Sequence, residues 1–459
     1  MKVRTIVTGM IIMCACITGF LGNVVLTSGV SAHPTQTQGT FTFDRHAILP
    51  LQQLQQYAQK LNVTSAKGST PEPSCITSAT SPRCYSPQQI RTAYTIPGVK
   101  SKGHTIVLID FATSPTLQSD VHLYDQFYGL KDPTINVFSP FSTPSTDPGY
   151  YTETALDIEM AHAIAPNATI DLVLANLDTA TDYGQLMNLA LQATQYAVQN
   201  NLGEVISQSF GVGESCVSAS YVQAEQQVFA QARAKGITVL ASSGDYGADV
   251  ISCSGAEVAL EEGVNLPAAD PLVTAVGGTT LNADVGTGRY VNETAWSGNG
   301  NLALFGATSG GVSTLFPSPD YQNGITGQAN RAIPDVAFDA DPNTGVPIVF
   351  SQNGGLYIVP VGGTSVGSPA WAAIVVLANQ VAGHRLGFLN TALYAISSSK
   401  NYASSFHDIT TGNNIVEGID FNGNITPATG YSAGQGWDAV TGIGTPVVQT
   451  LTQLLASQH

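Results

Sequence analysis

The sequence predicts an α/β fold with a central, mostly parallel sheet and helices on both of its faces. Two patterns support this prediction. Short, continuous runs rich in Val, Ile and Leu recur along the chain, as in strands that are buried on both faces. Longer segments with helical periodicity lie between these runs, and this alternation of strand and helix is typical of parallel sheets. We therefore expect a functional site at the carboxyl ends of the strands.

These patterns also place the individual elements. Strands are expected at residues 105–109, 169–174, 204–206, 237–241 and 272–276, and helices at residues 153–164, 183–199, 217–234 and 365–381. Two further apolar runs, 348–351 and 356–359, flank Asn353-Gly354, a dipeptide that favours a tight hairpin turn. This hairpin would lead directly into the segment that contains Ser365.

Residues 1–32 have the pattern of a secretory signal peptide. Lys2 and Arg4 precede a long apolar run, and small residues end the segment at Ala32. The alternative is an uncleaved membrane anchor, which the Gly, Thr and Asn residues inside the apolar run disfavour. We expect the mature chain to be secreted, extracellular and free of the membrane.

Two regions follow the predicted signal peptide. Residues 33–74 are rich in Gln, Thr and Ser, and they predict a linker or a short remnant of a pro-segment, with one short helix at residues 51–61. Residues 75–459 carry the α/β pattern and predict the main domain. A chain of this length can form one large α/β unit or two smaller ones.

The charge balance excludes one class of partner. The chain has 16 Lys and Arg residues against 32 Asp and Glu residues, a formal net charge of −16. Such an acidic chain is not expected to bind nucleic acid, because the phosphate backbone would repel it. Only 10% of the residues are charged, and a surface of neutral polar groups changes little when carboxylates become protonated, which is consistent with an acidic workplace.

Four cysteines remain after removal of the predicted signal peptide: Cys75, Cys84, Cys216 and Cys253. Four cysteines allow three pairings. Cys75 and Cys84 bracket a short loop and most simply pair with each other, which leaves Cys216 to pair with Cys253. Free or metal-bound thiols are the alternative, and an exported chain without a Cys-x-x-Cys motif disfavours them.

Ser365 is the candidate nucleophile. It lies in residues 363–369, Gly-Thr-Ser-Val-Gly-Ser-Pro, a segment similar to the nucleophile region of subtilisin-type hydrolases. A serine hydroxyl needs a positioned base. His162 points away from the face that carries the candidate carboxylates, and no suitable context surrounds the other histidines considered, His104, His122, His384 and His407. We therefore look for the base among the carboxylates.

Glu153 and Asp157 are the predicted source of that base. They are four residues apart in a predicted helix and share one of its faces. Two carboxyl groups so close push their proton affinities apart, so Glu153 can act as general base on Ser365 while Asp157 orients it and supports its charge. The alternative is an exposed acidic face at a helix start, which the helix dipole favours.

Asp245 is the predicted oxyanion donor. The segment Ser243-Gly244-Asp245 directly follows the strand predicted at residues 237–241, at a carboxyl end. Acyl transfer needs a hydrogen-bond donor at the developing oxyanion, worth about 3 kcal/mol. A protonated Asp can donate whereas a carboxylate cannot, so we expect Asp245 to act at acid pH and to fail near neutrality. The alternative is a turn-forming Asp in an Asx-turn.

Asp110 would serve a different mechanism. It follows the strand predicted at residues 105–109, as the triad Asp of subtilisins ends their first strand. A neutral subtilisin-like peptidase would pair it with a histidine from a His-Gly-Thr-His segment, and this chain has no such segment after it. We therefore do not expect Asp110 to be a catalyst.

These segments together resemble the sedolisin family of serine-carboxyl peptidases, which includes kumamolisins and tripeptidyl-peptidases. The resemblance runs from about Cys75 to the C-terminus, and other segments in the family's order support it: residues 205–211, 266–269, 276–280, 310–313 and 334–336. It implies a subtilisin-like fold, and it assigns the family's catalytic roles to Ser365, Glu153, Asp157 and Asp245. Carboxylates suit acid pH, because at about pH 4 an ordinary imidazole is protonated whereas a Glu is still partly ionised. The family usually carries a long folded pro-domain, so the short segment before Cys75 predicts a difference in activation.

The resemblance also implies one structural calcium ion near the C-terminus. The ligands carried over are the side chains of Asp408 and Asp438 and the main-chain carbonyls of Ile409, Gly434 and Gly436. Carboxylate and carbonyl oxygens are the ligands that calcium prefers. The alternative is a Gly- and Asn-rich surface loop without a metal.

The predicted function is that of a secreted, monomeric, acid-acting peptidase that cleaves proteins or peptides through an acyl-enzyme on Ser365. Serine-type endopeptidase activity is expected, and stepwise removal of tripeptides is the variant within the same family. Two other functions stay open on the sequence: a calcium-stabilised pseudo-peptidase that only binds, and a neutral subtilisin-like peptidase that uses Asp110.

Overall fold

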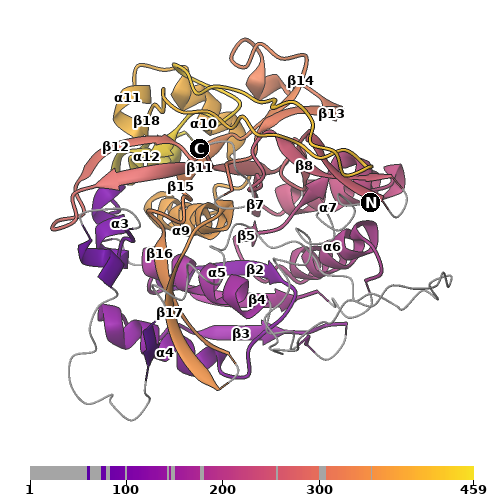
Figure 1. The fold of residues 1–459 in the computed structure, drawn as a ribbon. Helices are drawn as coiled ribbons and strands as arrows, with labels where there is room; N and C mark the ends of the chain where they lie inside the picture. The colour runs from indigo at the N-terminus through magenta and orange to yellow at the C-terminus, as the bar shows by residue number, and fades with distance from the viewer. Residues whose placement is uncertain are drawn as a thin grey trace, which may run out of the picture.

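The computed structural model describes residues 59–61 (main chain only), 74–78, 83–98, 101–141, 144–145, 150–175, 180–254, 257–298, 306–352 and 354–458. The predicted signal peptide and most of the predicted linker lie outside these residues. The described chain forms a central sheet between two layers of helices (Figure 1).

The central sheet has eight strands, and the predicted mostly parallel arrangement is confirmed. From one edge its strands are β3 (Ile135–Phe138), β4 (Thr169–Leu174), β2 (Thr105–Asp110), β5 (Val205–Gln208), β7 (Thr238–Ser242) and β11 (Thr274–Ala283). All of these pairs are parallel. β15 (Val336–Asp339) pairs in parallel with β11, and β12 (Tyr290–Ala295) pairs with it antiparallel. The five predicted strands correspond to β2, β4, β5, β7 and the first part of β11.

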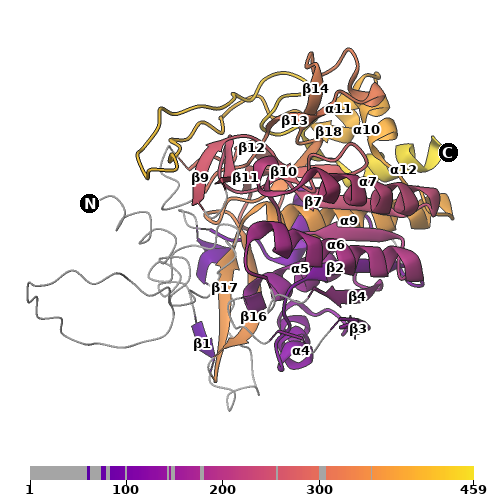
Figure 2. The ribbon, with the colours of Figure 1, turned by 90° about the vertical axis from the view of Figure 1, so that its right-hand side faces the viewer.

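Different helices cover the two faces of the sheet (Figure 2). α5 (Tyr151–Ile164), α9 (Thr364–Ala382) and α12 (Val448–Ser457) pack on one face, and α6 (Tyr183–Asn200) and α7 (Ala219–Ala234) pack on the other. The side chains of β2 alternate between them, because successive strand residues point to opposite faces. Ile106 and Leu108 join the core with α5 and α9, whereas Val107 and Ile109 join the core with α6 and α7. The four predicted helices are confirmed by α5, α6, α7 and α9.

α9 is the central helix of the molecule. Among the helices in the described part of the chain, it alone has the length and hydropathy of a membrane span, yet 83% of that stretch is buried inside the protein. It contacts α5, α12 and strands β2, β5, β7, β11 and β15. α9 is therefore the core helix onto which the sheet and its neighbouring helices pack.

A separate hairpin leads into α9. β16 (Val346–Gln352) and β17 (Gly355–Val361) pair antiparallel, and Gln352 faces Gly355 across the turn, as predicted from Asn353-Gly354. Residues 59–61 form strand β1 (Gln59–Leu61) on the outer edge of β17. The helix predicted at residues 51–61 is therefore wrong at its end, because the free main-chain groups of β17 pair this segment as a strand; the rest of that prediction lies outside the described residues.

The remaining elements surround this framework. The helices are α3 (Pro87–Ala93), α4 (Leu117–Tyr128), α10 (Asn390–Ser397) and α11 (Tyr402–Ser405), with single 3₁₀ turns at Ser74–Thr77, Glu214–Cys216 and Asp320–Gln322. The short strands form four pairs: β6 (Val212–Gly213) with β10 (Asn265–Leu266), β8 (Asp249–Ser254) with β9 (Glu257–Glu262), β13 (Gly311–Pro317) with β14 (Asn330–Ile333), and β18 (Phe406–His407) with β19 (Thr445–Pro446).

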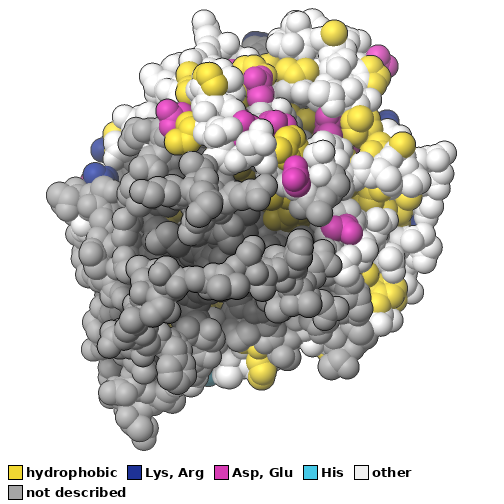
Figure 3. All heavy atoms as spheres, turned by 45° about the vertical axis from the view of Figure 1, so that its right-hand side comes forward, with side chains coloured by type: hydrophobic (Ala, Val, Ile, Leu, Met, Phe, Trp, Pro, Cys, Tyr) yellow, Lys and Arg dark blue, Asp and Glu magenta, His cyan; other side chains and the backbone are white. Residues whose placement is uncertain are grey.

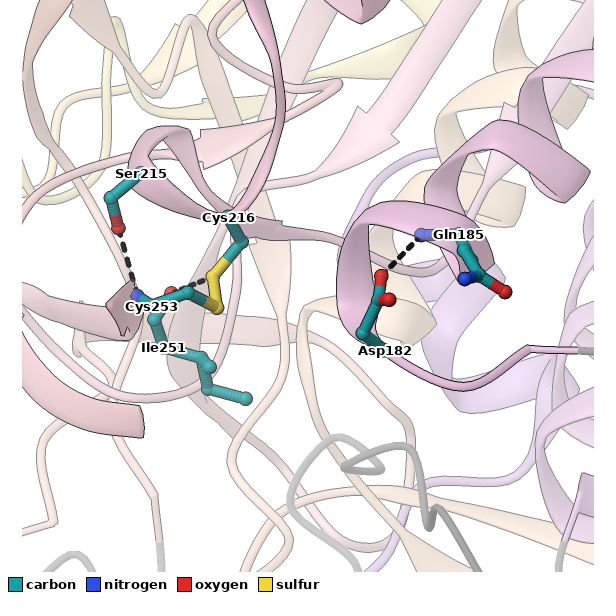
Figure 4. Close-up of a disulfide and its surroundings, with 6 residues drawn as sticks. All are labelled: Asp182, Gln185, Ser215, Cys216, Ile251 and Cys253. Carbon is teal, nitrogen blue, oxygen red and sulfur yellow. Dashed lines mark hydrogen bonds between the residues drawn. A yellow bond between two sulfur atoms is a disulfide. The ribbon is translucent and has the colours of Figure 1, made fainter. Parts of the chain in front are cut away.

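Both expected disulfides are present. Cys75 pairs with Cys84, and Cys216 pairs with Cys253 at a Cα–Cα distance of 4.8 Å. The second disulfide joins the chain before α7 to β8, where the main-chain N–H of Cys253 also donates to Ser215 Oγ at 3.0 Å (Figure 4). The alternative of free or metal-bound thiols is thereby excluded for these four residues.

Candidate active site

Ser365 lies in the first turn of α9, after a tight connection from β17. Gly363 caps the helix with a φ of 103°, and a Cβ on Gly362 would lie 2.4 Å from the carbonyl oxygen of Ala340. Both positions therefore require glycine. The N–H groups in the first turn of a helix lack intrahelical acceptors and favour negative charge. An oxyanion formed by attack of Ser365 would thus develop at the favourable end of α9.

The predicted carboxylate pair lies on α5, which packs directly against α9. Glu153 is in the first turn of α5 and Asp157 follows one turn later. The hydroxyl of Thr154 donates to the carbonyl oxygen of Ala112 at 2.8 Å, which holds the start of α5 beside the carboxyl end of β2. Asp157 is completely buried, and its Oδ1 accepts a hydrogen bond of 2.8 Å from the hydroxyl of Ser209. Because Ser209 follows β5, α5 is attached to the ends of two neighbouring strands.

Asp110 joins the pair on α5 to make a group of three interacting carboxyls. Burial, followed by repulsion from Asp110 and Glu153, raises the pKa of Asp157 well above its usual range. Burial, followed by repulsion from Glu153, likewise raises the pKa of Asp110. Both aspartates therefore retain their protons at acid pH. A carboxyl that stays protonated can donate to a neighbouring carboxylate, which is what an orienting partner of Glu153 has to do.

Ser365 Oγ is buried and forms no hydrogen bond with any residue that the structure describes. The contact expected between Ser365 and Glu153 is therefore not made as a hydrogen bond in this conformation. Catalytic hydrogen bonds are often long before substrate binds and shorten in the complex. The structure brings together the two helices that carry these residues.

Asp245 follows β7 and is attached to the residue that precedes the candidate nucleophile. Its Oδ1 accepts hydrogen bonds from the main-chain N–H and from the hydroxyl of Thr364, both at 2.8 Å. The side chain is 2% exposed. The carboxyl group is thus buried and held next to Ser365, as an oxyanion donor requires.

The turn that carries Asp245 is closely packed. Gly244 has a φ of 118°, and a Cβ on it would lie 2.2 Å from Asn265 Nδ2. That amide donates to the carbonyl oxygen of Ser243 at 2.9 Å. Ser309 binds the turn twice, since its N–H donates to the carbonyl oxygen of Gly244 at 2.8 Å and its Oγ accepts from the N–H of Tyr246 at 3.1 Å. The position of Asp245 is therefore fixed from both sides.

Asp110, Ser209 and Thr364 are site residues to which the sequence analysis gave no role. From the sequence, Asp110 is expected to act only with a histidine partner, although its place at the end of a central strand is a signal for the site. Ser209 and Thr364 stood inside segments quoted for the family resemblance. Only the packing of α5 and α9 on the sheet shows what their hydroxyls contact.

His162, which is not expected to be a catalyst, lies on the side of α5 that faces α4. Its Nε2 is 2.9 Å from Asp125 Oδ1, and both side chains are buried. A role as base for Ser365 would require it to leave this partner.

Two of the segments that carry the predicted calcium ligands contact each other, the one that contains Asp408 and the one at residues 434–438. The N–H of Gly436 donates to both carboxylate oxygens of Asp408 at 3.1 Å, and the N–H of Gly434 donates to Asp438 Oδ2 at 2.9 Å. Within the described ranges, no three His, Cys, Asp or Glu side chains gather as a metal-binding group. A cation here would depend on two carboxylates and on main-chain carbonyls such as that of Ile409. An all-oxygen donor set of this kind fits a hard cation.

Comparison with known proteins shows which proteins this chain is similar to. No family model matches the chain. Kumamolisin of Bacillus sp. (strain MN-32) is 34% identical over 389 residues, covering 82% of this chain and 64% of that protein. Sedolisin of Pseudomonas sp. (strain 101) is 35% identical over 272 residues, covering 58% and 43%. Tripeptidyl-peptidase 1 of Rattus norvegicus is 30% identical over 281 residues, covering 56% and 44%. The chain thus spans less than two thirds of the length of these relatives.

A solved structure gives the closer spatial comparison. Pseudomonas sedolisin, a serine-carboxyl proteinase complexed with two molecules of pseudo-iodotyrostatin, superposes with a TM-score of 0.69 at 29% identity, covering 81% of this chain and 98% of that chain. The α/β architecture is therefore the subtilisin-like fold expected from the sequence. In both sequence and fold, the chain is similar to the sedolisin family of serine-carboxyl peptidases.

Proposed function

We propose that this protein hydrolyses peptide bonds in proteins or peptides at acid pH through an acyl-enzyme on Ser365. The observation that carries the proposal is the group of carboxyls on α5 and β2 beside α9, together with Asp245 bound to Thr364. The relatives named as kumamolisin, sedolisin and tripeptidyl-peptidase support the reaction class.

The proposed steps use only residues of this chain. Ser365 Oγ attacks the substrate carbonyl carbon while Glu153 takes the hydroxyl proton, and protonated Asp157 stabilises Glu153 by donating to it. Protonated Asp245 donates to the oxyanion of the tetrahedral intermediate. Glu153 then delivers its proton to the leaving amine, and the C–N bond breaks to leave the acyl-enzyme. Water, deprotonated by Glu153, attacks the ester, and Ser365 regains its proton.

Two variants test this function directly. Digestion of a denatured protein at about pH 4, where an ordinary Glu is partly ionised, is expected to be lost in Ser365→Ala and in Glu153→Ala. Full activity in either variant would contradict the assignment. The peptide products separate internal cleavage from stepwise removal of tripeptides. If a peptide aldehyde does not react with Ser365 of the wild type at acid pH, the result would favour a pseudo-peptidase that binds peptides without cleaving them.

We also propose that Asp408, Asp438 and the carbonyls of Ile409, Gly434 and Gly436 hold one calcium ion. Calcium would hold together a loop that has little secondary structure. Removal of calcium with a chelator is therefore expected to lower the Tm, and added calcium to restore it. The control is Asp408→Asn, whose Tm should be low and insensitive to the chelator; a wild-type Tm unchanged by the chelator would contradict the site.

Export is the remaining part of the proposal. Two disulfides are characteristic of a protein that folds in an oxidising compartment. Expression of the full chain with its first 32 residues is expected to place the protein in the medium, with a new N-terminus that mass spectrometry can locate.

A further inference from the structure

Thr364 donates two hydrogen bonds to the Asp245 carboxyl group. Its N–H and its hydroxyl both donate to the same oxygen, Oδ1, at 2.8 Å. A carboxyl oxygen has two lone pairs, so two donors occupy Oδ1. A proton on this carboxyl group is then placed on the other oxygen, Oδ2.

The hydroxyl of Thr364 is itself held in one orientation. Its Oγ1 accepts a hydrogen bond from the N–H of Gly244 at 3.1 Å, so its single hydrogen is directed to Asp245. The side chain is completely buried, and a Cβ on Gly278 would lie 3.4 Å from its methyl carbon. Packing of the methyl group and a β-branched Cβ leave the side chain little freedom.

We propose that Thr364 is a positioning residue that directs the catalytic proton of Asp245 to Oδ2. The inference rests on the proposed function, in which Asp245 donates to the oxyanion. A carboxyl with its proton on a fixed oxygen can be aimed before substrate arrives, whereas a carboxyl that can protonate on either oxygen donates correctly only part of the time.

The proposal predicts a change in pH dependence with a definite sign. Hydrogen bonds donated to a carboxyl group stabilise its ionised form more than its protonated form, so they lower its pKa. Loss of the Thr364 hydroxyl therefore raises the pKa of Asp245. Because activity requires this group to be protonated, the alkaline limb of the pH profile moves to higher pH. The turnover at the optimum falls, because the proton is no longer restricted to Oδ2.

The matched variants are Thr364→Val, which keeps the shape and removes the hydroxyl, and Thr364→Ser, which restores the hydroxyl. Thr364→Val is expected to lower kcat about tenfold with little change in KM, and to move the alkaline limb up by about one pH unit, the equivalent of one net hydrogen bond. Thr364→Ser is expected to return the limb to its wild-type position. If the alkaline limb of Thr364→Ser moves up by about one pH unit, the proposal is overturned. This test does not depend on whether Thr364→Val folds.

Infrared titration of the Asp245 carboxyl, identified by its loss in Asp245→Asn, supplies a measurement that does not need activity. Its midpoint is expected to rise in Thr364→Val. A folded Thr364→Val protein with lower activity at every pH and an unchanged midpoint would show a merely structural role and overturn the inference. Full activity in Ser365→Ala would instead defeat the proposed function, and the titration would still test the Thr364–Asp245 contact.

Discussion

Asp157 receives one side-chain hydrogen bond in the described structure, the 2.8 Å bond from Ser209. This bond opposes the other influences on the group, since burial and the neighbouring carboxyls raise the pKa of Asp157 whereas Ser209 lowers it. Ser209→Ala is expected to raise the pKa of Asp157 further and to leave a buried oxygen without a donor, at a cost of about 1–3 kcal/mol. Urea unfolding measures this loss. Activity is expected to fall as well, because Asp157 no longer holds Glu153 in one orientation.

Ser207→Ala is the matched control for that prediction. Ser207 lies on β5, the strand that Ser209 follows, and its hydroxyl is 2.8 Å from that of Ser368 on α9, in a buried pair that does not include a catalytic group. It should reduce stability and leave the pH profile of the remaining activity in place. If both variants change the pH profile alike, the Ser209 contact has no special role.

Residue chemistry explains which parts of the site could be predicted. Glu153 and Asp157 are four apart on one helix, and Ser365 and Asp245 stand in short motifs, so sequence alone assigned their roles. The contacts of Asp110, Ser209 and Thr364 depend on how α5, α9 and three strands pack, and no local pattern encodes such contacts. The roles of all seven side chains remain predictions for the experiments above.

In the β16–β17 hairpin, the free edge of β16 donates main-chain hydrogen bonds to two carboxyl side chains. The N–H of Val349 donates to Glu159 Oε2 at 2.9 Å, and the N–H of Ser351 donates to Asp120 Oδ2 at 2.9 Å. These N–H groups belong to alternate residues of β16, so two side chains from α5 and α4 occupy the edge where another strand could pair. The hairpin leads into α9, so this edge supports the position of Ser365.

Glu159→Gln tests this edge. Burial, followed by repulsion from Asp120 and Asp125, raises the pKa of Glu159 well above its usual range, although the bond from Val349 opposes the shift. The stability that a raised pKa confers is complete below the pKa of the unfolded chain and is lost as the pH rises through the native pKa. Gln keeps the acceptor and cannot ionise. The fall in Tm on going from acid to neutral pH is therefore expected to be smaller in Glu159→Gln, by roughly 2 °C or more.

The exposed Glu257 on β9 provides the control. Glu257→Gln removes the same charge from the surface, where it should leave the pH dependence of the Tm nearly unchanged. Equal effects of the two substitutions would mean that net charge, and not the β16 edge, governs the response.

At the level of elements, segments with a continuous apolar or helical pattern were predicted well, and short strands without such a pattern were missed. α6 and β4 have the predicted bounds to within a residue because their apolar patterns are continuous. β3 is an edge strand with a half-exposed pattern, so its sequence lacks the run of apolar residues that marks the central strands. β1 is a strand because it pairs with the free edge of β17. The local sequence of residues 59–61 cannot predict this pairing.

Over the whole molecule, the acidic chain combines a negative surface with many buried carboxyls. Figure 3 shows acidic side chains on the upper part of one face, where Lys and Arg are few. Burial, opposed by a hydrogen bond from Leu272 and by Arg331, raises the pKa of Asp270 to about 6. Burial, followed by Glu262 and Glu261, raises that of Asp249 to about 7. Ionisation of such groups in the folded state is unfavourable, and the net charge of −16 at neutral pH adds self-repulsion.

The fold is therefore expected to be most stable in acid. The pKa of Glu225 is also raised well above its usual range, by burial and then by Asp270. The stability from these raised values is complete below about pH 4, where the unfolded carboxyls titrate, and it is lost as the pH passes the native values of about 6 for Asp270 and about 7 for Asp249. Urea midpoints measured from acid to neutral pH should fall through this window, and Glu225→Gln should reduce the fall. A midpoint that increases toward neutral pH would show that these carboxyls are not protonated in the native protein, and the same result would remove the physical reason for expecting Asp157 to hold a proton.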